Sequence, residues 1–244
     1  MFAVIFVVHP KPGRKDDYLE LAGQLKPILE RIDGFIDNER FESKRTEGDV
    51  LSLSIWRDEK SLVRWRTQSD HHEVQEKGRF EVFEDYHLRV GEITADSHPP
   101  EGASVGSSRF DDTEVAESKV CTITEVVPAD KSFRPGLIAA LPAHLGIDVG
   151  IPGLIDHVVF EGITMPGKLL MLIDWQNASA AGKWQPQPFA GIASLRHRQV
   201  RVIRVYGMHE RREAPQYYRT VGPVANGSKG HAEPPTQTIG KFFA

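Results

Sequence analysis

The sequence predicts a mixed α+β protein that contains two copies of one β-α-β-β-α-β unit. Displacing the chain by 119 residues aligns residues 34–65 with 153–184 without a gap, and ten of these 32 positions are identical. Average residue usage would give about two identities. The identical pairs are Gly34/Gly153, Ile36/Ile155, Asp37/Asp156, Phe41/Phe160, Glu42/Glu161, Gly48/Gly167, Leu51/Leu170, Leu53/Leu172, Trp56/Trp175 and Trp65/Trp184. The second observation is the order of apolar runs and helical stripes, which matches the ferredoxin-like split βαβ pattern.

The first copy opens with a strand and a helix. Residues 2–9 are predicted to form a strand, because "FAVIFVV" is a continuous apolar run of strand length. Residues 15–32 carry apolar side chains at helical spacing, and Gly34 ends this pattern. The apolar stripe consists of Tyr18, Leu21, Leu25, Ile28, Leu29 and Ile32.

The rest of the unit follows in order. Strands near 35–43 and 49–56 flank a turn at Gly48, a second helix runs to about Glu76, and a last strand covers 82–93. Asp58 is the expected N-cap of the second helix, and its counterpart Asn177 is also a favoured capping residue.

The first strand also predicts how the two halves pack. It shows no polar alternation, so both of its faces should be covered. Helices of the same half cover one face only, and the second copy supplies a sheet for the other. We therefore expect two units packed sheet to sheet as an internal pseudo-dimer, with domains at 1–95 and 119–213, a Pro/Gly/Ser-rich linker at 96–118 and an extended C-terminal arm at 214–244.

Composition excludes several classes of function. The chain has 244 residues, 30 Lys and Arg against 34 Asp and Glu, and a formal net charge of −4, which argues against a nucleic-acid partner. Its single cysteine, Cys121, has no intrachain partner for a disulfide, and no His/Cys spacing predicts a metal site. No apolar run reaches transmembrane length, and no targeting segment is evident. We expect a cytoplasmic protein that does not bind membranes.

The stretch "LSLSIWRDEKSLVRW", followed by "SDHHE" and "GRFEVFEDYHLRV", resembles the antibiotic biosynthesis monooxygenase superfamily of dimeric α+β barrels. The resemblance rests on Trp56 at the end of a strand, Asp58 at a helix start, and His71 or His72 near the end of that helix. It implies a barrel made within one chain, with frequent further association into homo-oligomers. It also implies oxidation of small aromatic molecules by O2 without a cofactor. The haem-degrading branch has an Asn where this chain has Phe6 to Val8.

The histidine pair is the candidate for base catalysis. Counting 100° per residue along one continuous helix places His72 about 20° from Trp65, whereas the family motif aligns with His71. Both histidines stay candidates. An imidazole beside an apolar cleft accepts a phenolic proton and leaves an electron-rich anion that can react with O2. A solvated helix end is the alternative reading of the pair.

Candidate substrate-binding residues come from the comparison of the two copies. Ser52 and Ser54 correspond to Met171 and Ile173, so small side chains leave room in the first half where large ones fill the second. The other candidates for the pocket wall are Trp56, Trp65, Tyr86 and Arg89. Both tryptophans recur in the second half, which also fits a packing role, and Tyr86 and Arg89 also fit a half-exposed strand.

These observations favour a cofactor-independent monooxygenase that acts on a small aromatic or quinol substrate held between sheet and helix in the first half. Two alternatives remain at this point. One is a haem-binding, less readily haem-degrading, protein, and the other is a non-catalytic protein that binds a small ligand. Fold alone does not separate them, because function resides in the site.

Overall fold

The computed structural model of the protein describes residues 1–130, 135–148 and 150–215. The first half contains β1 (Phe2–Pro10), α1 (Lys15–Leu29), β2 (Phe35–Ser43), β3 (Val50–Trp56), α2 (Glu59–Arg66), α3 (Ser69–Lys77), a π-helical turn (Gly78–Val82) and β4 (Phe83–Asp96). The second half contains β5 (Val120–Pro128), α4 (Pro135–His144), β6 (Leu154–Gly162), β7 (Leu169–Trp175), α5 (Ala178–Lys183) and β8 (Ile192–Gly207).

The eight strands form one closed antiparallel barrel in the order β1-β3-β2-β6-β7-β5-β8-β4. Within each half the order is that of a ferredoxin-like unit, with β1 and β3 or β5 and β7 at the centre. The edge strands of the two halves then pair, β2 with β6 and β4 with β8. Closure leaves no exposed sheet edge. The predicted α+β class and the predicted pairing of two ferredoxin-like repeats within one chain are confirmed.

The displacement of 119 residues is also the structural equivalence between the halves. Phe35 pairs with Trp56 across β2 and β3, and Leu154 pairs with Trp175 across β6 and β7. Gly34 and Gly153 both have a positive φ, of 87° and 82°. A Cβ at Gly34 would lie 2.0 Å from the Ser61 hydroxyl oxygen, so the α2 N-terminus can approach the chain only because this residue is glycine.

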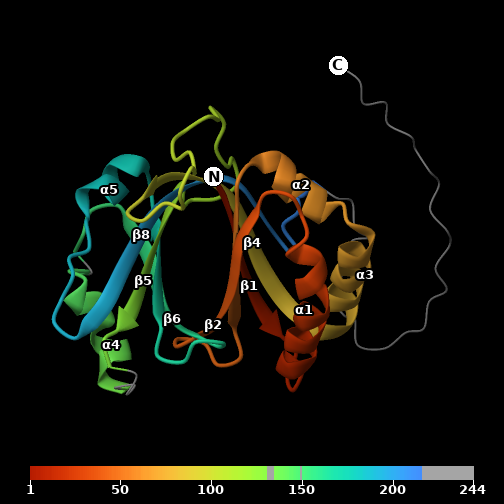
Figure 1. The fold of residues 1–244 in the computed structure, drawn as a ribbon, viewed down its shortest axis with the longest axis horizontal. Coiled ribbons are helices and arrows are strands. Elements are labelled where there is room, and N and C mark those ends of the chain that lie inside the picture. The colour runs from red at the N-terminus through yellow and green to blue at the C-terminus, as the bar shows by residue number, and fades with distance from the viewer. Residues whose placement is uncertain (131–134, 149, 216–244) are drawn as a thin grey trace.

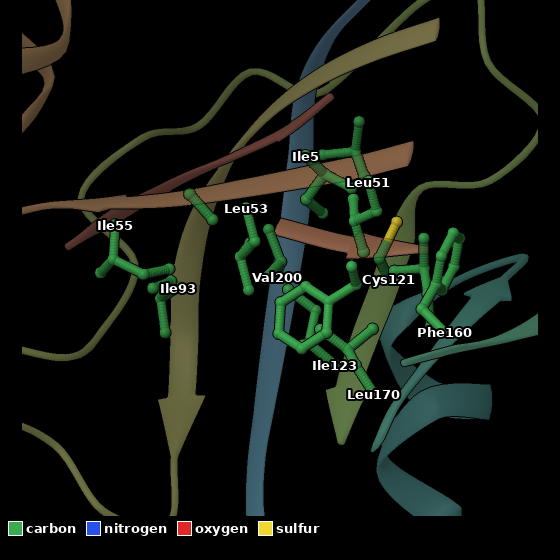
Figure 2. Packing of buried hydrophobic residues seen from close by; sticks show 14 of the residues in the cluster. Ile5, Leu51, Leu53, Ile55, Ile93, Cys121, Ile123, Phe160, Leu170 and Val200 are labelled. Carbon is green, nitrogen blue, oxygen red and sulfur yellow. The ribbon is translucent and has the colours of Figure 1, made fainter. Parts of the chain in front are cut away.

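Apolar side chains from both halves fill the barrel interior (Figure 2). Ile5, Leu51 and Ile93 of the first half belong to the same buried cluster as Ile123 and Leu170 of the second. This cluster explains the continuous apolar run of β1, because one face of that strand points into the barrel and the other points towards the helices. Burial of this shared core joins the two repeats into one body.

Ion pairs reinforce the junction of the halves. Arg89 of β4 donates to Asp174 of β7 at 2.5 Å, and Lys44 contacts Glu161 at 2.6 Å. Lys168 of the second half contacts Glu39 of the first. Each of these charges comes from one repeat and finds its counter-ion in the other.

Helices cover the outside of the barrel on two sides (Figure 1). The helices α1, α2 and α3 lie over the first half of the sheet, and α4 and α5 lie over the second. The predicted caps are confirmed: the Asp58 side chain accepts from the Ser61 backbone N–H, and Asn177 accepts from the Ala180 N–H. No helix among the described residues is long and apolar enough to cross a membrane.

The predicted continuous helix from Asp58 to Glu76 is in fact two helices. The Thr67 hydroxyl donates back to the Val63 carbonyl at 3.0 Å, and Gln68 has an extended backbone with ψ of 131°. The Thr67 backbone N–H still bonds to the same Val63 carbonyl, and the helix ends at Gln68, where the backbone becomes extended. The break changes the direction of every side chain in α3 relative to α2.

The segment between the halves is more ordered than a flexible tether. Ala103 and Val105 pack against the core of the barrel, and Thr113 is fully buried. The Glu92 carboxylate accepts from the Ser108 backbone N–H at 2.7 Å. The linker therefore lies against the body of the protein. Of the expected C-terminal arm, residues 216–244 lie outside the described residues.

Candidate active site in the first repeat

A cavity of about 200 Å³ lies between the outer face of the first half of the sheet and the helices α1, α2 and α3. Its floor consists of two rows of side chains that follow the strand register across β2, β3, β1, β4 and β8. One row is Arg40, Ser52, Phe6, Leu88 and Tyr206, and the next row is Asn38, Ser54, Val4, Val90 and Arg204. The floor is thus polar at its two edges and apolar in the middle.

The second half has no such floor. Across β6 and β7, the positions equivalent to Arg40, Ser52 and Ser54 hold Val159, Met171 and Ile173. Met171 and Ile173 are fully buried among the side chains of α4 and α5. The same backbone therefore carries a hollow in one repeat and a packed apolar layer in the other.

Ser52 and Ser54 line the cavity, and each hydroxyl is held from behind. The Asn38 side-chain amide donates to the Ser52 oxygen at 3.1 Å, and the Trp56 indole N–H donates to the Ser54 oxygen at 2.9 Å. Trp56 itself is fully buried and is not among the lining residues, so it supports the floor rather than forming the wall. The Ser54 hydroxyl keeps its own O–H for donation, whereas the Ser52 hydroxyl also bonds to the Tyr18 phenol.

His71 forms part of the helical wall. Its ring stacks on Trp65 at a centroid distance of 4.1 Å and an interplanar angle of 17°. Its Nδ1 lies 3.1 Å from the Trp65 carbonyl oxygen, which can only accept, so Nδ1 carries the proton. Its Nε2 then accepts from the Gln75 amide at 3.3 Å. Burial lowers the pKa of His71 to about 4, so the imidazole is neutral at physiological pH.

His72 does not face the cavity. It is exposed, and the cavity is lined by His71 instead. The angular count that favoured His72 assumed one uninterrupted helix, and the break at Thr67 and Gln68 invalidates that count. The structure therefore selects His71 of the two candidates by position.

The remaining predicted residues separate by strand face. Tyr86 lines the cavity, and its hydroxyl oxygen accepts from Arg79 at 2.9 Å and from Arg211 at 2.6 Å. Arg89 lies on the opposite face of β4 and does not line the cavity. Its guanidinium is bonded to Asp174 and contacts the Cys121 sulfur at 3.2 Å. Successive side chains of β4 point to opposite faces of the sheet. Arg89 therefore points to the face away from the cavity, where it joins β4 to β7 through Asp174.

Comparisons with known proteins identify the family. A protein from Pyricularia oryzae, described as "Jasmonate monooxygenase ABM", is 42% identical over 227 residues, which cover 89% of this chain and 98% of that protein. The chain belongs to the antibiotic biosynthesis monooxygenase family. The model of that family matches residues 1–77, which lie within the first repeat.

Two solved structures show a more distant likeness to this chain. An anthrone oxidase-like protein is 15% identical and covers 88% of this chain and 96% of its own length, with a TM-score of 0.33. A structure described as an antibiotic biosynthesis monooxygenase is 17% identical and covers 41% of this chain and all of its own, with a TM-score of 0.35.

Several residues that line the cavity were not predicted from the sequence. Arg40 and Asn38 occupy β2, and the repeat comparison that selected Ser52 would also have selected Arg40, because its counterpart is Val159. Tyr18 is predicted as part of the apolar stripe of the first helix, and in the structure it also lines the cavity. Burial raises the pKa of its phenol, whereas its contacts with Arg40 and Ser52 lower it.

The cavity is positively charged and has no cluster of metal ligands. Its lining arginines are Arg40, Arg66, Arg79, Arg204 and Arg211. The lining carboxylate is Glu59, which accepts from Arg109 at 2.5 Å. Within the described residues, no group of three or more His, Cys, Asp and Glu side chains could hold a metal ion. The site therefore offers a neutral imidazole, hydroxyl groups and guanidinium groups to a ligand.

Proposed function

We propose that this protein is a monooxygenase whose substrate is a small, largely apolar molecule bound in the cavity of the first repeat, and that it works without a metal or a flavin. The observation that carries the proposal is the position of His71: a half-buried, neutral imidazole in the wall of a cavity with an apolar middle and cationic edges, within the repeat that the family model matches. The name of the Pyricularia oryzae relative makes jasmonate the first substrate to test, beside aromatic and quinol compounds.

In this proposal His71 accepts a proton from an acidic O–H of a phenol or enol substrate. Its pKa of about 4 makes the free imidazole a weak base. Formation of the substrate anion next to it favours the imidazolium, because an opposite charge in a site of low dielectric raises the pKa. The cationic lining also stabilises the anion. The Trp65 carbonyl fixes Nδ1 as the protonated nitrogen, and Nε2 becomes the base when the substrate O–H takes the place of the Gln75 amide.

The substrate anion supplies the electrons for O2. Oxygen adds to its electron-rich carbon to give a hydroperoxide, and loss of water from a CH–OOH group leaves a C=O group. The net change is conversion of a CH2 group and O2 into C=O and H2O, so the substrate provides all the electrons. His71 receives the first proton and returns it to the peroxide anion formed by O2 addition, which gives the hydroperoxide that then loses water.

The test compares two adjacent histidines. Oxygen uptake and the mass of the product are measured with jasmonate and with a panel of hydroquinones, for the wild type, His71→Ala and His72→Ala. We expect His71→Ala to lower kcat by about 100-fold or more. His72→Ala, which alters an exposed ring outside the cavity, should stay within about twofold of the wild type.

Equal activity of the wild type and His71→Ala would refute the base role. Binding of a panel member without oxygen uptake would favour the non-catalytic alternative. The haem-binding alternative predicts a shifted Soret band when haemin is added to the wild type, and loss of that shift in the variant that removes the ligating histidine.

A further inference from the structure

Arg40 differs in its partners from two other cations of the barrel. Lys168 contacts the carboxylates of Glu39 and Glu125, and Arg198 contacts Glu125 and Asp96. Arg40 is half-buried and has no carboxylate within ion-pair distance among residues 1–130, 135–148 and 150–215, and its Nε is buried without a hydrogen-bond partner. Taking part of a cation out of water without a counter-ion costs desolvation energy, so the retention of Arg40 needs a reason.

The fold does not require a cation at this position. The equivalent residue of the second repeat is Val159, which is buried in an apolar cluster with the same strand register. An apolar side chain therefore satisfies the backbone and the packing here. The charge of Arg40 is specific to the repeat that contains the cavity.

The surroundings of Arg40 define what could neutralise it. The Tyr18 phenol interacts with both the Arg40 guanidinium and the Ser52 hydroxyl at this corner of the floor. The next positions along the same row are Phe6 and Leu88, which are apolar. A molecule that fits has an anionic group with several hydrogen-bond acceptors at one end and an apolar body at the other. A carboxylate meets the first condition, because it accepts two N–H bonds from one guanidinium.

We infer that Arg40 binds the carboxylate of an amphipathic substrate, whose apolar body lies over Phe6 and Leu88 within reach of the helical wall that carries His71. The inference rests on the proposed function in taking this cavity as the substrate site. It adds that the substrate is a carboxylic acid, and that its carboxylate end, rather than its apolar end, contacts the sheet at Arg40.

Arg204 is another lining arginine that could bind the carboxylate in place of Arg40. It lies on β8 at the opposite edge of the floor, four strands away from Arg40, which corresponds to about 19 Å at the usual strand spacing. It also has no carboxylate partner among the described residues, but none of its nitrogens is buried without a hydrogen bond. One small carboxylate cannot contact both arginines, so substitution separates them.

The experiment uses 4-phenylbutyrate and its neutral amide, 4-phenylbutyramide, as probes in isothermal titration calorimetry. We expect the wild type to bind the acid at least tenfold more tightly than the amide, since a hydrogen bond to a charged group contributes about 1.5–3 kcal/mol. Arg40→Gln should remove this preference by weakening binding of the acid, with binding of the amide unchanged. Arg40→Lys keeps the charge and should retain part of the preference.

Arg31→Gln is the charge-matched control. Arg31 is exposed on the outer surface, and its substitution removes the same unit of charge. It should leave both affinities unchanged. The assignment is contradicted if the wild type binds the acid no better than the amide. It is also contradicted if Arg40→Gln keeps the preference, or if the loss appears in Arg204→Gln instead. Circular dichroism of each variant verifies folding. The ratio of the wild-type affinities for the acid and the amide tests the inference even if a variant fails to fold.

Binding and turnover fail independently. If Arg40→Gln loses the acid preference but no substrate is oxidised by the wild type, the anion site stands and the oxygenase proposal falls. If oxidation depends on His71 while the acid and the amide bind equally, the reverse holds.

Discussion

The two repeats have the same strands in the same register, yet the outer face of the sheet borders a cavity in the first repeat and a packed apolar layer in the second. In the first repeat, Ser52 and Arg40 face a hollow beneath three helical segments. In the second, Met171 and Val159 take the same positions and are packed under α4 and α5. The backbone of this fold therefore does not create the cavity. The size and polarity of a few floor residues, together with the covering helices, decide whether the space is open.

The equivalent tryptophans show the same divergence. Trp184 is buried, donates to the Leu145 carbonyl at 3.0 Å and packs on Trp175. Trp65 instead lines the cavity and stacks on His71. In the second repeat, an extended stretch after α5 replaces the segment that forms α3 in the first, and no histidine corresponding to His71 is present. The helices of the second repeat pack directly on its sheet, whereas those of the first repeat leave a cavity.

The largest expected effect comes from opening the packed repeat. Met171→Ser gives the second half the residue found at position 52, and it leaves a void among fully buried side chains. We expect the free energy of unfolding to fall by about 3 kcal/mol or more, because large-to-small core substitutions cost about 2–5 kcal/mol. Urea unfolding measures it. A loss below about 1 kcal/mol would show that the second repeat is not tightly packed.

Acid should destabilise the protein through buried neutral histidines. Burial lowers the pKa of His197 and of His71 to about 4. Because the unfolded state takes up protons from about pH 6.5 downwards and the folded state only near pH 4, stability is lost as the pH falls between these values.

His197, which bonds to the Thr124 hydroxyl at 2.9 Å, is the cleaner probe. Replacing it with Gln should reduce the loss between pH 6.5 and 4 by roughly 3 kcal/mol, since the pKa falls from 6.5 to about 4 and one unit of pKa corresponds to about 1.4 kcal/mol. Urea unfolding at several pH values measures the difference. An unchanged pH profile would mean that folding does not lower the pKa of His197.

The reciprocal exchange fills the open repeat. Ser52→Met introduces the second repeat's side chain into the floor of the cavity, and it leaves the bond from Trp56 to Ser54 intact. We expect binding of 4-phenylbutyrate to weaken at least tenfold, because the methionine occupies the space beside Arg40. Stability should stay the same or rise. Calorimetry and urea unfolding measure the two effects, and unchanged affinity would place the ligand elsewhere.

The smallest effect concerns the helix caps that the repeats share. Asp58→Ala and Asn177→Ala each remove a side-chain acceptor from a helix N-terminus, and each should cost about 1 kcal/mol of stability. Asp58→Ala should also weaken ligand binding, because α2 carries Trp65 into the cavity wall. Asn177→Ala should leave binding unchanged. Equal effects of the two on binding would argue against a separate role for the first repeat.

Features with a local physical cause were predictable from the sequence. The turn at Gly48, the caps at Asp58 and Asn177, and the strand bounds near residues 35–43 follow from residue type and periodicity. The duplication predicted the pairing of two sheets, and the exchange of Ser52 for Met171 predicted where space would lie.

Other features were not predictable from residue type and periodicity. Angular counting assumes one unbroken helix, and the break at Thr67 and Gln68 removes the geometric argument for His72 while the motif argument for His71 stands. Arg89 and Tyr86 were both plausible wall residues until the barrel fixed which face of β4 points towards the helices. The contrast of Arg40 with Val159 was visible in the repeat comparison, but the lack of a carboxylate beside Arg40 is visible only in three dimensions.

The four tryptophans, two in each repeat, provide the most direct test of the central claim that the first repeat alone admits a ligand. The measurement is the set of four indole N–H signals in an NMR spectrum of ¹⁵N-labelled protein titrated with 4-phenylbutyrate, with each signal assigned by a Trp→Phe variant. We predict a saturable shift of the Trp65 signal and a smaller one of Trp56, with Trp175 and Trp184 unmoved. Shifts of Trp175 and Trp184 with an unmoved Trp65 would contradict the account.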